Sequence, residues 1–305
     1  MKQQIPRVFV SVLLATKDRH NALSRCIASL CAGTYKDFEI IIVDQTASPY
    51  SSHISHANVR YIHDPRRGKG KALNLALSRA RGDICAFIDD DCIASKNWLR
   101  SIQDAFSKHP SISGVFGKTL PFTKKGLVQT KYCPAIYLPA EDRIISSPCY
   151  HADHIGFGNN MAFRTNVCRS IREFTTLLGP GSIGLAALDA EFALKALEHN
   201  YRILSTPNVL VYHNKWLNAQ QLERQNNIYV CGEIACYGYY AFHGYPFAQH
   251  ILYRDIQNMI KKTRQSISFN DYWHSLVHLS YISRGFLVAT LYSVNRALTS
   301  KHVSR

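Results

Sequence analysis

Long apolar runs, paired cysteines and acidic residues are scarce in this sequence of 305 residues. The longest apolar stretches, residues 8–15 and 285–294, are far shorter than the roughly 20 residues that a membrane-spanning helix needs. None of the nine cysteines has CxxC spacing, and the first residues do not have the layout of a secretion signal. We therefore expect a reduced, cytoplasmic setting, without a transmembrane helix.

The scarcity of acids leaves a strong positive charge. Thirty-six Lys and Arg outnumber 21 Asp and Glu, which gives a net charge of +15. Such a protein favours phosphorylated ligands, polyanions or an anionic membrane face. Residues 215–305 are basic and aromatic together, since they hold ten Lys and Arg, four Asp and Glu, and 15 of the 34 aromatic residues. The 46% hydrophobic content excludes intrinsic disorder of the whole chain.

The first 120 residues alternate strand-like and helix-like patterns. Apolar residues recur at helical spacing over 23–31 and 73–80. Strand-like runs occupy residues 8–15, 38–43, 59–62 and 84–88. This β-α-β-β-α-β order predicts an α/β fold, a Rossmann-like, doubly wound and mostly parallel sheet that binds ligands beyond the carboxyl ends of its strands. We expect a catalytic domain over 1–214, with halves 1–120 and 121–214, and a helical C-terminal extension over 215–305.

Carboxylates stand where the predicted strands end. Asp44 ends the second strand, and Asp89, Asp90 and Asp91 directly follow the fourth. The fold brings them to one edge, where their repulsion favours a hard divalent cation such as Mg²⁺ or Mn²⁺. The alternative is a solvated turn that caps a helix beginning near Lys96.

A glycine-rich basic loop, RRGKGK over residues 66–71, precedes the second predicted helix. Backbone amides and cations at a helix N-terminus can hold phosphate, although the spacing is not that of a P-loop. A solvated basic turn is the alternative.

Several stretches together carry a resemblance to a known family. They are VSVLLATKDR at 10–19, IIIVDQTAS at 40–48, the segment from RRGKGK to IDDDC at 66–92, GFGNNMAFR at 156–164, and the segment from GPGSIG to LVYH at 179–213. In this order they resemble the family 2 glycosyltransferases of the GT-A fold, across residues 7 to 213.

The resemblance implies a nucleotide-sugar pocket with Mg²⁺ or Mn²⁺ as cofactor. It places Asp91 first among the metal ligands, with Asp89 on the metal or ribose. His213, which ends the strand-like run VLVYH, could join the metal or the diphosphate, or could be structural. Lys17 stands where the family often has an aromatic residue. The resemblance assigns these residues to the donor: Ala15, Thr16, Asp18, Asp44, Lys71, Asn74, Asp89 and Asp90.

On the acceptor side, the family has a Glu-Asp pair that opens a helix and supplies the catalytic base. Here Leu188 replaces the glutamate, and Asp189 matches the base; a plain helix N-cap is the alternative. The resemblance also places four residues against the sugar or acceptor, namely Gly158, Asn159, Asn160 and Glu191, although helical geometry turns Glu191 away from Asp189.

Together these features predict a metal-dependent, inverting glycosyltransferase, with a UDP-sugar favoured as donor and a glycan or lipid-linked hydroxyl as acceptor. A sugar-phosphate nucleotidyltransferase and a non-catalytic anion- or membrane-binding protein are the alternatives. We expect no nucleic-acid partner and allow for a homo-oligomer. The C-terminal stripe that includes Leu276, Leu279, Ile282 and Phe286 fits a helix on the inner face of an anionic membrane. It equally fits a helix packed on the catalytic domain or on another subunit. The cluster Cys149, His151, Asp153 and His154 has no second pair at zinc-finger spacing, so we do not expect structural zinc.

Overall fold

The computed structural model describes residues 8–49, 56–123, 131–148, 155–171, 173–264 and 269–301. The cluster Cys149, His151, Asp153 and His154 lies outside these residues.

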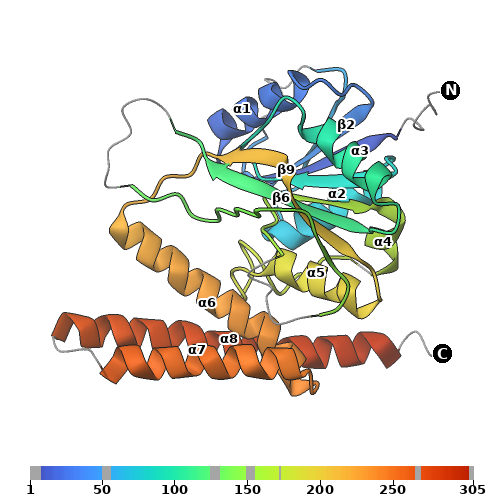
Figure 1. Ribbon diagram of the computed structural model, residues 1–305. Helices are drawn as coiled ribbons and strands as arrows, with labels where there is room; N and C mark the ends of the chain where they lie inside the picture. The colour runs from blue at the N-terminus through green and yellow to red at the C-terminus, as the bar shows by residue number, and fades with distance from the viewer. Residues whose placement is uncertain are drawn as a thin grey trace.

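One mixed sheet forms the centre of the catalytic region (Figure 1). Its strand order is β3-β2-β1-β4-β8-β6-β9-β5, and β7 pairs with β9. Strands β1, β2, β3 and β4 run parallel, as do β6 and β9, whereas β8 is antiparallel to both of its neighbours. The strands are β1 (Val10–Thr16), β2 (Phe38–Asp44), β3 (Val59–His63), β4 (Ile84–Ile88), β5 (Cys92–Ala94), β6 (Gly114–Pro121), β7 (Arg143–Ile145), β8 (Asn160–Arg164) and β9 (Ile203–His213).

Both faces of the sheet are buried, as the unbroken apolar strands predicted. Along β1, Leu13 packs into one core, while Val12 and Leu14 pack into the other, because successive side chains of a strand point to opposite faces. Helices α1 (His20–Cys31) and α3 (Trp98–Lys108) cover one face, and α2 (Lys69–Arg79), α4 (Thr165–Ser170) and α5 (Leu188–Glu198) cover the other. The predicted doubly wound, mostly parallel fold is confirmed.

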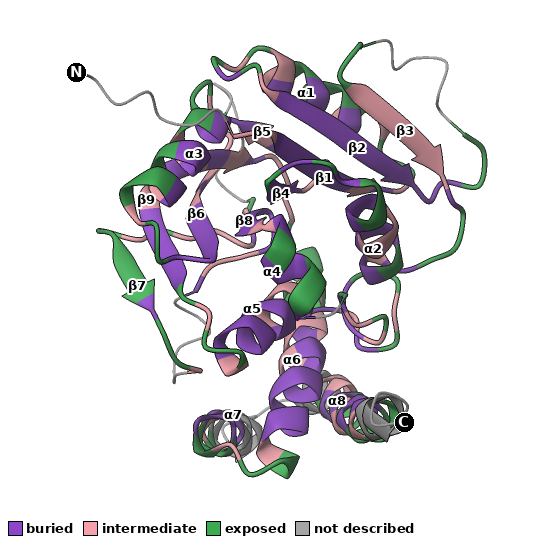
Figure 2. Cartoon of the chain, turned by 90° about the vertical axis from the view of Figure 1, so that its right-hand side faces the viewer, coloured by how far each residue is buried: buried purple, intermediate pink, exposed green. Residues whose placement is uncertain are grey.

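A helical layer of α6 (Ala219–Phe242), α7 (Pro246–Arg264) and α8 (Phe269–Lys301) lies beneath the sheet (Figure 1). Helix α6 joins the layer to the catalytic region, and Figure 2 shows α5 between the sheet and α6. Helices α6 and α8 approach closely, since a Cβ atom on Gly238 would lie 2.8 Å from the Cβ atom of Ala289. One hydrophobic core continues from the sheet into this layer, across the predicted boundary at residue 214.

The inner side of α8 is packed against the protein, with Ile282, Val288, Ala289 and Tyr292 buried. The structure therefore shows this side packed on α6 and, through Tyr292, on α5, while the outer side carries exposed apolar residues. Within the described ranges, no helix has both the length and the hydropathy of a membrane span.

Candidate active site

The Asp89–Asp91 triplet forms the centre of the site, in the turn between β4 and β5. Each carboxylate has a different cationic or hydroxyl partner. Asp89 pairs with the Nζ atom of Lys69, while Asp90 accepts a hydrogen bond of 2.7 Å from Thr16 Oγ1. The guanidinium of Arg19 lies 3.1 Å from Asp90 and 2.9 Å from Asp91. The triplet is thus an ion-pair centre rather than a solvated turn.

Burial determines how these carboxyl groups titrate. Asp90 is only 4% exposed, and burial, followed by the charge of Asp91, raises the pKa of Asp90 to about 6. Burial alone would also raise the pKa of Asp91, but His213 and Arg19 hold it well below its usual range. Ionised Asp91 therefore remains available to a cation.

His213 is oriented like a metal-ligating histidine. It ends β9 opposite Cys92, its Nδ1 atom lies 2.7 Å from the carbonyl oxygen of Pro134, and its Nε2 atom lies 3.3 Å from Asp91 Oδ1. A carbonyl partner on Nδ1 directs the Nε2 lone pair of a neutral imidazole toward the carboxylate. Burial alone would lower the pKa of His213, but Asp91 raises it to about 10, so a metal ion would have to displace this proton.

The donor set suits a divalent ion. Asp91, Cys92 and His213 each offer a ligand atom within 4.8 Å of the others, and Asp91 Oδ1 is buried without a hydrogen-bond partner. A buried carboxylate oxygen beside an imidazole can hold a divalent cation, which would replace the proton of His213. The structure brings two of the predicted ligands together, Asp91 and His213; the third, Asp89, is paired with Lys69. Cys92, the remaining residue of the three, is not one of the predicted ligands.

The basic loop presents a different lysine from the predicted one. Lys69, the first residue of α2, reaches Asp89, whereas Lys71 and Arg67 are exposed to solvent and Arg66 pairs with Asp64. Successive helical positions point about 100° apart, so Lys69 and Lys71 lie on nearly opposite sides of α2. Lys69 therefore joins the candidate donor-side residues, and the donor-side role of Lys71 stays a prediction. Arg19 was also missed, although the DR pair after the first strand is its sequence signal.

The predicted nucleotide-side residues share one edge of the sheet, because Thr16 and Asp44 are paired at the ends of β1 and β2. Ala15 is half-buried, and the side chain of Asp18 is 61% exposed with a left-handed backbone (φ 55°). Asp44 is fully buried and accepts hydrogen bonds from Tyr61 Oη (2.6 Å) and the backbone N–H of Thr46 (2.9 Å). In this structure Asp44 therefore organises the loop after β2.

The predicted base lies in the first turn of α5. Asp189 follows Leu188, and its Oδ2 atom accepts a hydrogen bond from the backbone N–H of Gly158. Gly158 is required by close approach, since a Cβ atom there would lie 2.9 Å from Asp189 Cβ. The N-cap position is occupied by Ala187 with φ 61° and no capping side chain, so the N-cap alternative for Asp189 is wrong.

Asp189 and two aspartates of the triplet, Asp89 and Asp91, shift the pKa values of the same two side chains, Lys69 and Tyr229. Burial alone would lower the pKa of Lys69, but Asp89, and after it Asp189 and Asp91, hold it above its ordinary value. Burial, with the same three carboxylates, raises the pKa of the Tyr229 phenol on α6. Lys69 and Tyr229 therefore lie within electrostatic reach of both Asp189 and the triplet. Tyr229 had no sequence signal, because it belongs to an aromatic helix with no motif.

Three amide side chains predicted to lie at the donor or acceptor have partners within the protein. The side-chain amide of Asn74 both donates to the carbonyl and accepts from the N–H of Phe174. Asn159 accepts from Thr119 Oγ1 and donates to the carbonyl oxygen of Ala135. Asn160, fully buried, accepts from Trp98 Nε1 and donates to two carbonyl oxygens. These bonds give each amide a structural role, and its assignment to the donor or acceptor stays a prediction.

The assignment of Glu191 to the acceptor side is corrected. Its side chain is fully buried between α5 and α8, where it contacts Tyr292 and Lys195. The helical turn between Asp189 and Glu191 gives the physical reason, because it directs them to different sides of α5.

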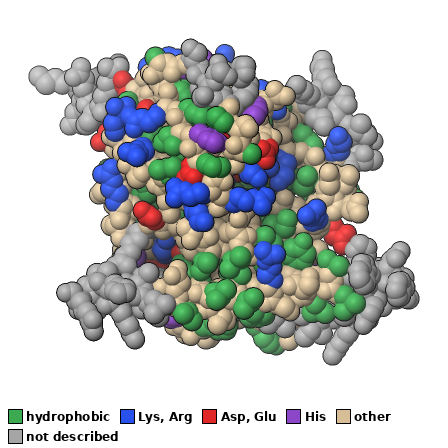
Figure 3. All heavy atoms as spheres, turned by 180° about the vertical axis from the view of Figure 1, so that it is seen from behind, with side chains coloured by type: hydrophobic (Ala, Val, Ile, Leu, Met, Phe, Trp, Pro, Cys, Tyr) green, Lys and Arg blue, Asp and Glu red, His purple; other side chains and the backbone are tan. Residues whose placement is uncertain are grey.

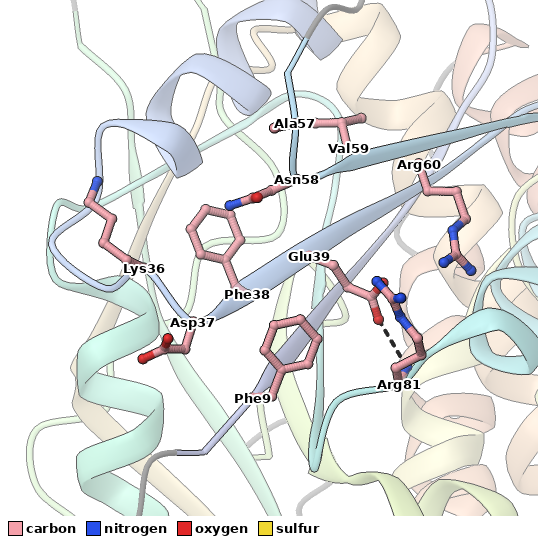
Figure 4. Close-up of a pocket in the computed structure, with 10 residues that line it drawn as sticks. All are labelled: Phe9, Lys36, Asp37, Phe38, Glu39, Ala57, Asn58, Val59, Arg60 and Arg81. Atoms are coloured by element: carbon pink, nitrogen blue, oxygen red, sulfur yellow. Dashed lines mark hydrogen bonds and ion pairs between the residues drawn. The ribbon is translucent and has the colours of Figure 1, made fainter.

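A separate cavity of about 380 Å³ lies at the opposite edge of the sheet, where β1, β2 and β3 begin (Figure 4). It includes Phe9, Phe38, Asn58 and the ion pair of Glu39 with Arg81. None of the residues assigned to the donor, metal or acceptor lines it, so it is distinct from the site around the triplet.

Comparison with solved structures supports the fold. A mannosyltransferase from Pyrobaculum calidifontis, solved with GDP-Man and Mn²⁺, superposes with a TM-score of 0.57 at 15% identity, covering 96% of this chain and 80% of that one. Staphylococcus aureus TarS 1–349, solved with UDP-GlcNAc, gives 0.55 at 16% identity, covering 90% and 81%. At this identity the likeness shows the GT-A fold alone.

Curated relatives match over shorter stretches. A glucosyl-dolichyl phosphate glucuronosyltransferase from Haloferax volcanii is 26% identical over 123 residues, 38% of this chain and 39% of that protein. The glycosyltransferase EpsJ of Bacillus subtilis is 30% identical over 112 residues, 34% and 33% of the two lengths. The chain thus spans well under half the length of these relatives.

The family model settles the resemblance that the motifs suggested. It covers the strands and helices from β1 to α4, including the triplet and the basic loop. Because the model for glycosyl transferase family 2 matches residues 11–172, more than half of the sequence, this chain belongs to that family.

Proposed function

We propose that this protein transfers a sugar from a nucleoside diphosphate donor to a hydroxyl group, with inversion at the anomeric carbon. One observation carries the proposal: helices α2 and α5 begin side by side, since a Cβ atom on Gly70 would lie 3.4 Å from Leu188 Cδ1. Lys69, with its partner Asp89, and Asp189 therefore come from adjoining helix starts. A base on one side and charge-stabilising groups on the other are what a single in-line displacement needs.

Asp189 is the proposed base. One oxygen of its carboxylate, Oδ2, accepts the Gly158 N–H, which holds the side chain from that side. As the acceptor oxygen attacks the anomeric carbon, its proton passes to Asp189, and the bond to the diphosphate breaks. A positioned base contributes roughly 10²–10⁴ in rate.

Arg19 and Lys69 are the proposed diphosphate-side cations, since both already lie beside the triplet. We propose Asp91 and His213 as the residues that hold Mg²⁺ or Mn²⁺, supported by the orphaned Asp91 oxygen. When bound, the ion neutralises charge on the leaving diphosphate. The P. calidifontis neighbour was solved with Mn²⁺.

The direct test is Asp189→Asn, with Glu198→Gln as the matched control at the other end of α5. Asp189→Asn is expected to keep nucleotide affinity within twofold and to lose transfer by at least 10²-fold, whereas Glu198→Gln keeps both. Transfer by Asp189→Asn at the wild-type rate would contradict the assignment of the base.

The donor is proposed to be a UDP-sugar and the acceptor a glycan or lipid-linked hydroxyl. Solved neighbours hold GDP-Man in one case and UDP-GlcNAc in another, so both nucleotides belong in the test. Thermal shifts with UDP-, GDP- and dTDP-sugars, with and without Mn²⁺, identify the donor. A larger shift with a GDP-sugar would overturn the UDP preference.

We also propose that α8 contacts an anionic membrane, on its cytoplasmic face. Leu287, Leu291 and Val294 are 60%, 44% and 54% exposed, and residues 276–295 contain no acid. Figure 3 shows hydrophobic side chains gathered over the lower part of the molecule, where this layer lies. A larger fraction of the protein should sediment with phosphatidylglycerol vesicles than with phosphatidylcholine vesicles, and this fraction should fall in Leu287→Ser/Leu291→Ser. Equal sedimentation in all cases would refute the contact.

A further inference from the structure

A buried carboxylate connects the catalytic helix α5 to the C-terminal helix α8. Glu191 Oε1 accepts a hydrogen bond from the hydroxyl group of Tyr292 and lies 3.3 Å from the Nζ atom of Lys195. Glu191 is fully buried, and its second oxygen has no hydrogen-bond partner. Nothing in the proposed chemistry uses this group directly.

The network is a poor source of stability. Buried ion pairs recover their desolvation cost only with complete hydrogen bonding, and apolar replacements are often neutral or stabilising. Here one carboxylate oxygen remains unsatisfied. The network instead fixes an orientation. The hydroxyl of Tyr292 holds the carboxylate of Glu191, and this favours one rotation of the first turns of α5.

The start of α5 has no capping side chain, and its N-cap residue, Ala187, lies in the left-handed region. Its first turns pack through the buried side chains of Leu188 and Phe192. Two hydrogen bonds orient its carboxylates: Gly158 N–H to Asp189 on one side, and Tyr292 to Glu191 on the other. Because Asp189 and Glu191 are two residues apart, a rotation of α5 that moves one also moves the other.

Tyr292 is itself held firmly in the helical layer. It is 4% exposed, and its ring centroid lies 4.5 Å from that of Tyr239 on α6. One turn before it, Val288 would contact a Cβ atom placed on Gly184, in the loop that leads into α5. Helix α8 therefore touches both the loop before the base and the helix after it.

We propose that Tyr292, acting through Glu191, is a positioning residue that sets the orientation of Asp189, so that the C-terminal helical layer controls the catalytic base. This inference rests on the proposed role of Asp189. It gives the helical layer, which lies outside the matched family segment, a part in the reaction.

The chain offers a matched control at the other end of α5. There Tyr245 donates a hydrogen bond of 2.6 Å to Glu198, again from the helical layer to a carboxylate of α5. Tyr245→Phe removes the same kind of bond, but at a distance from Asp189 along the helix.

The test compares Tyr292→Phe with Tyr245→Phe. Tyr292→Phe is expected to lower kcat about tenfold, which is the scale of a base displaced by a fraction of an ångström, while KM for the donor and nucleotide affinity stay within twofold. Tyr245→Phe should keep kcat within twofold, even if the melting temperature falls by the same amount in both variants. Equal losses of kcat in the two, or wild-type kcat in Tyr292→Phe, would overturn the inference.

A second variant covers the case in which Tyr292→Phe does not fold. Glu191→Leu/Lys195→Met/Tyr292→Phe replaces the whole buried network with apolar groups of similar size. Neither the hydroxyl nor a charge of the network is then left without its partner, so the melting temperature should not fall. The same tenfold loss of kcat is expected, and unchanged kcat would refute positioning. If Asp189→Asn is inactive while these variants are fully active, the inference alone fails; if Asp189→Asn is active, the proposed function fails first.

Discussion

Gly158 provides the sharpest prediction, because a single methyl group there should displace the base. The Cβ atom of Gly158→Ala would lie 2.9 Å from Asp189 Cβ, 3.2 Å from Oδ2 and 3.3 Å from Cγ. Ordinary carbon contacts begin near 3.5 Å, so Asp189 must retreat by about 0.5 Å. The backbone of Gly158 is not left-handed, so the substitution adds no strain of its own.

The size of the effect follows from that displacement. A misplacement of about 1 Å can cost about 10²-fold in rate, so half of it is expected to cost about tenfold, or about 1.4 kcal/mol in activation free energy. The nucleotide side is untouched, and nucleotide affinity should therefore stay within twofold.

The assay measures kcat under saturating donor and acceptor, with nucleotide affinity by calorimetry. Gly33→Ala is the control, since its Cβ atom would be similarly crowded, 3.0 Å from the carbonyl oxygen of Leu30, but at the end of α1 on the opposite face of the sheet. A Gly158→Ala enzyme with wild-type kcat, in a protein whose Asp189→Asn variant is inactive, would refute the reasoning.

Three further outcomes are expected. Lys69→Met should weaken nucleotide binding at least tenfold by calorimetry, because Lys69 is the loop cation beside Asp89; unchanged affinity would remove it from the donor site. Burial alone would raise the pKa of Glu39, but Arg81 holds that pKa below its ordinary value. The ion pair therefore stabilises the folded protein fully above the ordinary pKa of a glutamate, and this stabilisation is lost as the pH falls through the lowered pKa of Glu39. In urea unfolding, the free energy of unfolding should fall less between pH 7 and pH 3 in Glu39→Gln than in the wild type. An equal fall in the two proteins would contradict this. Asn160→Ala leaves three buried partners unpaired and should lower the free energy of unfolding by about 3 kcal/mol, whereas a loss below about 1 kcal/mol would show that water replaces them.

Local sequence patterns were enough to predict the strands around the site. The unbroken apolar run at β1 predicted a strand buried on both faces, and Leu13 and Leu14 do pack into separate cores. The same reasoning placed the Asp89–Asp91 triplet at the edge of the sheet. What it did not predict is the antiparallel β8, because the direction of a strand depends on its neighbours rather than on its own residues.

Individual side chains in the site were harder to predict. The basic loop does lie beside the triplet, but the contact with Asp89 belongs to Lys69, since the start of α2 fixes which lysine faces the triplet. Asn160 resembled a pocket residue, yet it binds Trp98, which is 62 positions away in the chain. No linear motif carries that information, because both partners are brought together only by the order of the strands.

The sequence alone determined the elements, their order and the carboxylates and cations at their ends, because these depend on short-range periodicity and on where apolar runs stop. The tertiary structure decided which charges meet: Arg19 with Asp90 and Asp91, His213 with Asp91, and Glu191 with Tyr292. The physical reason is that ion pairs and hydrogen bonds act over a few ångströms, and only the folded sheet and its helical layer bring distant residues that close.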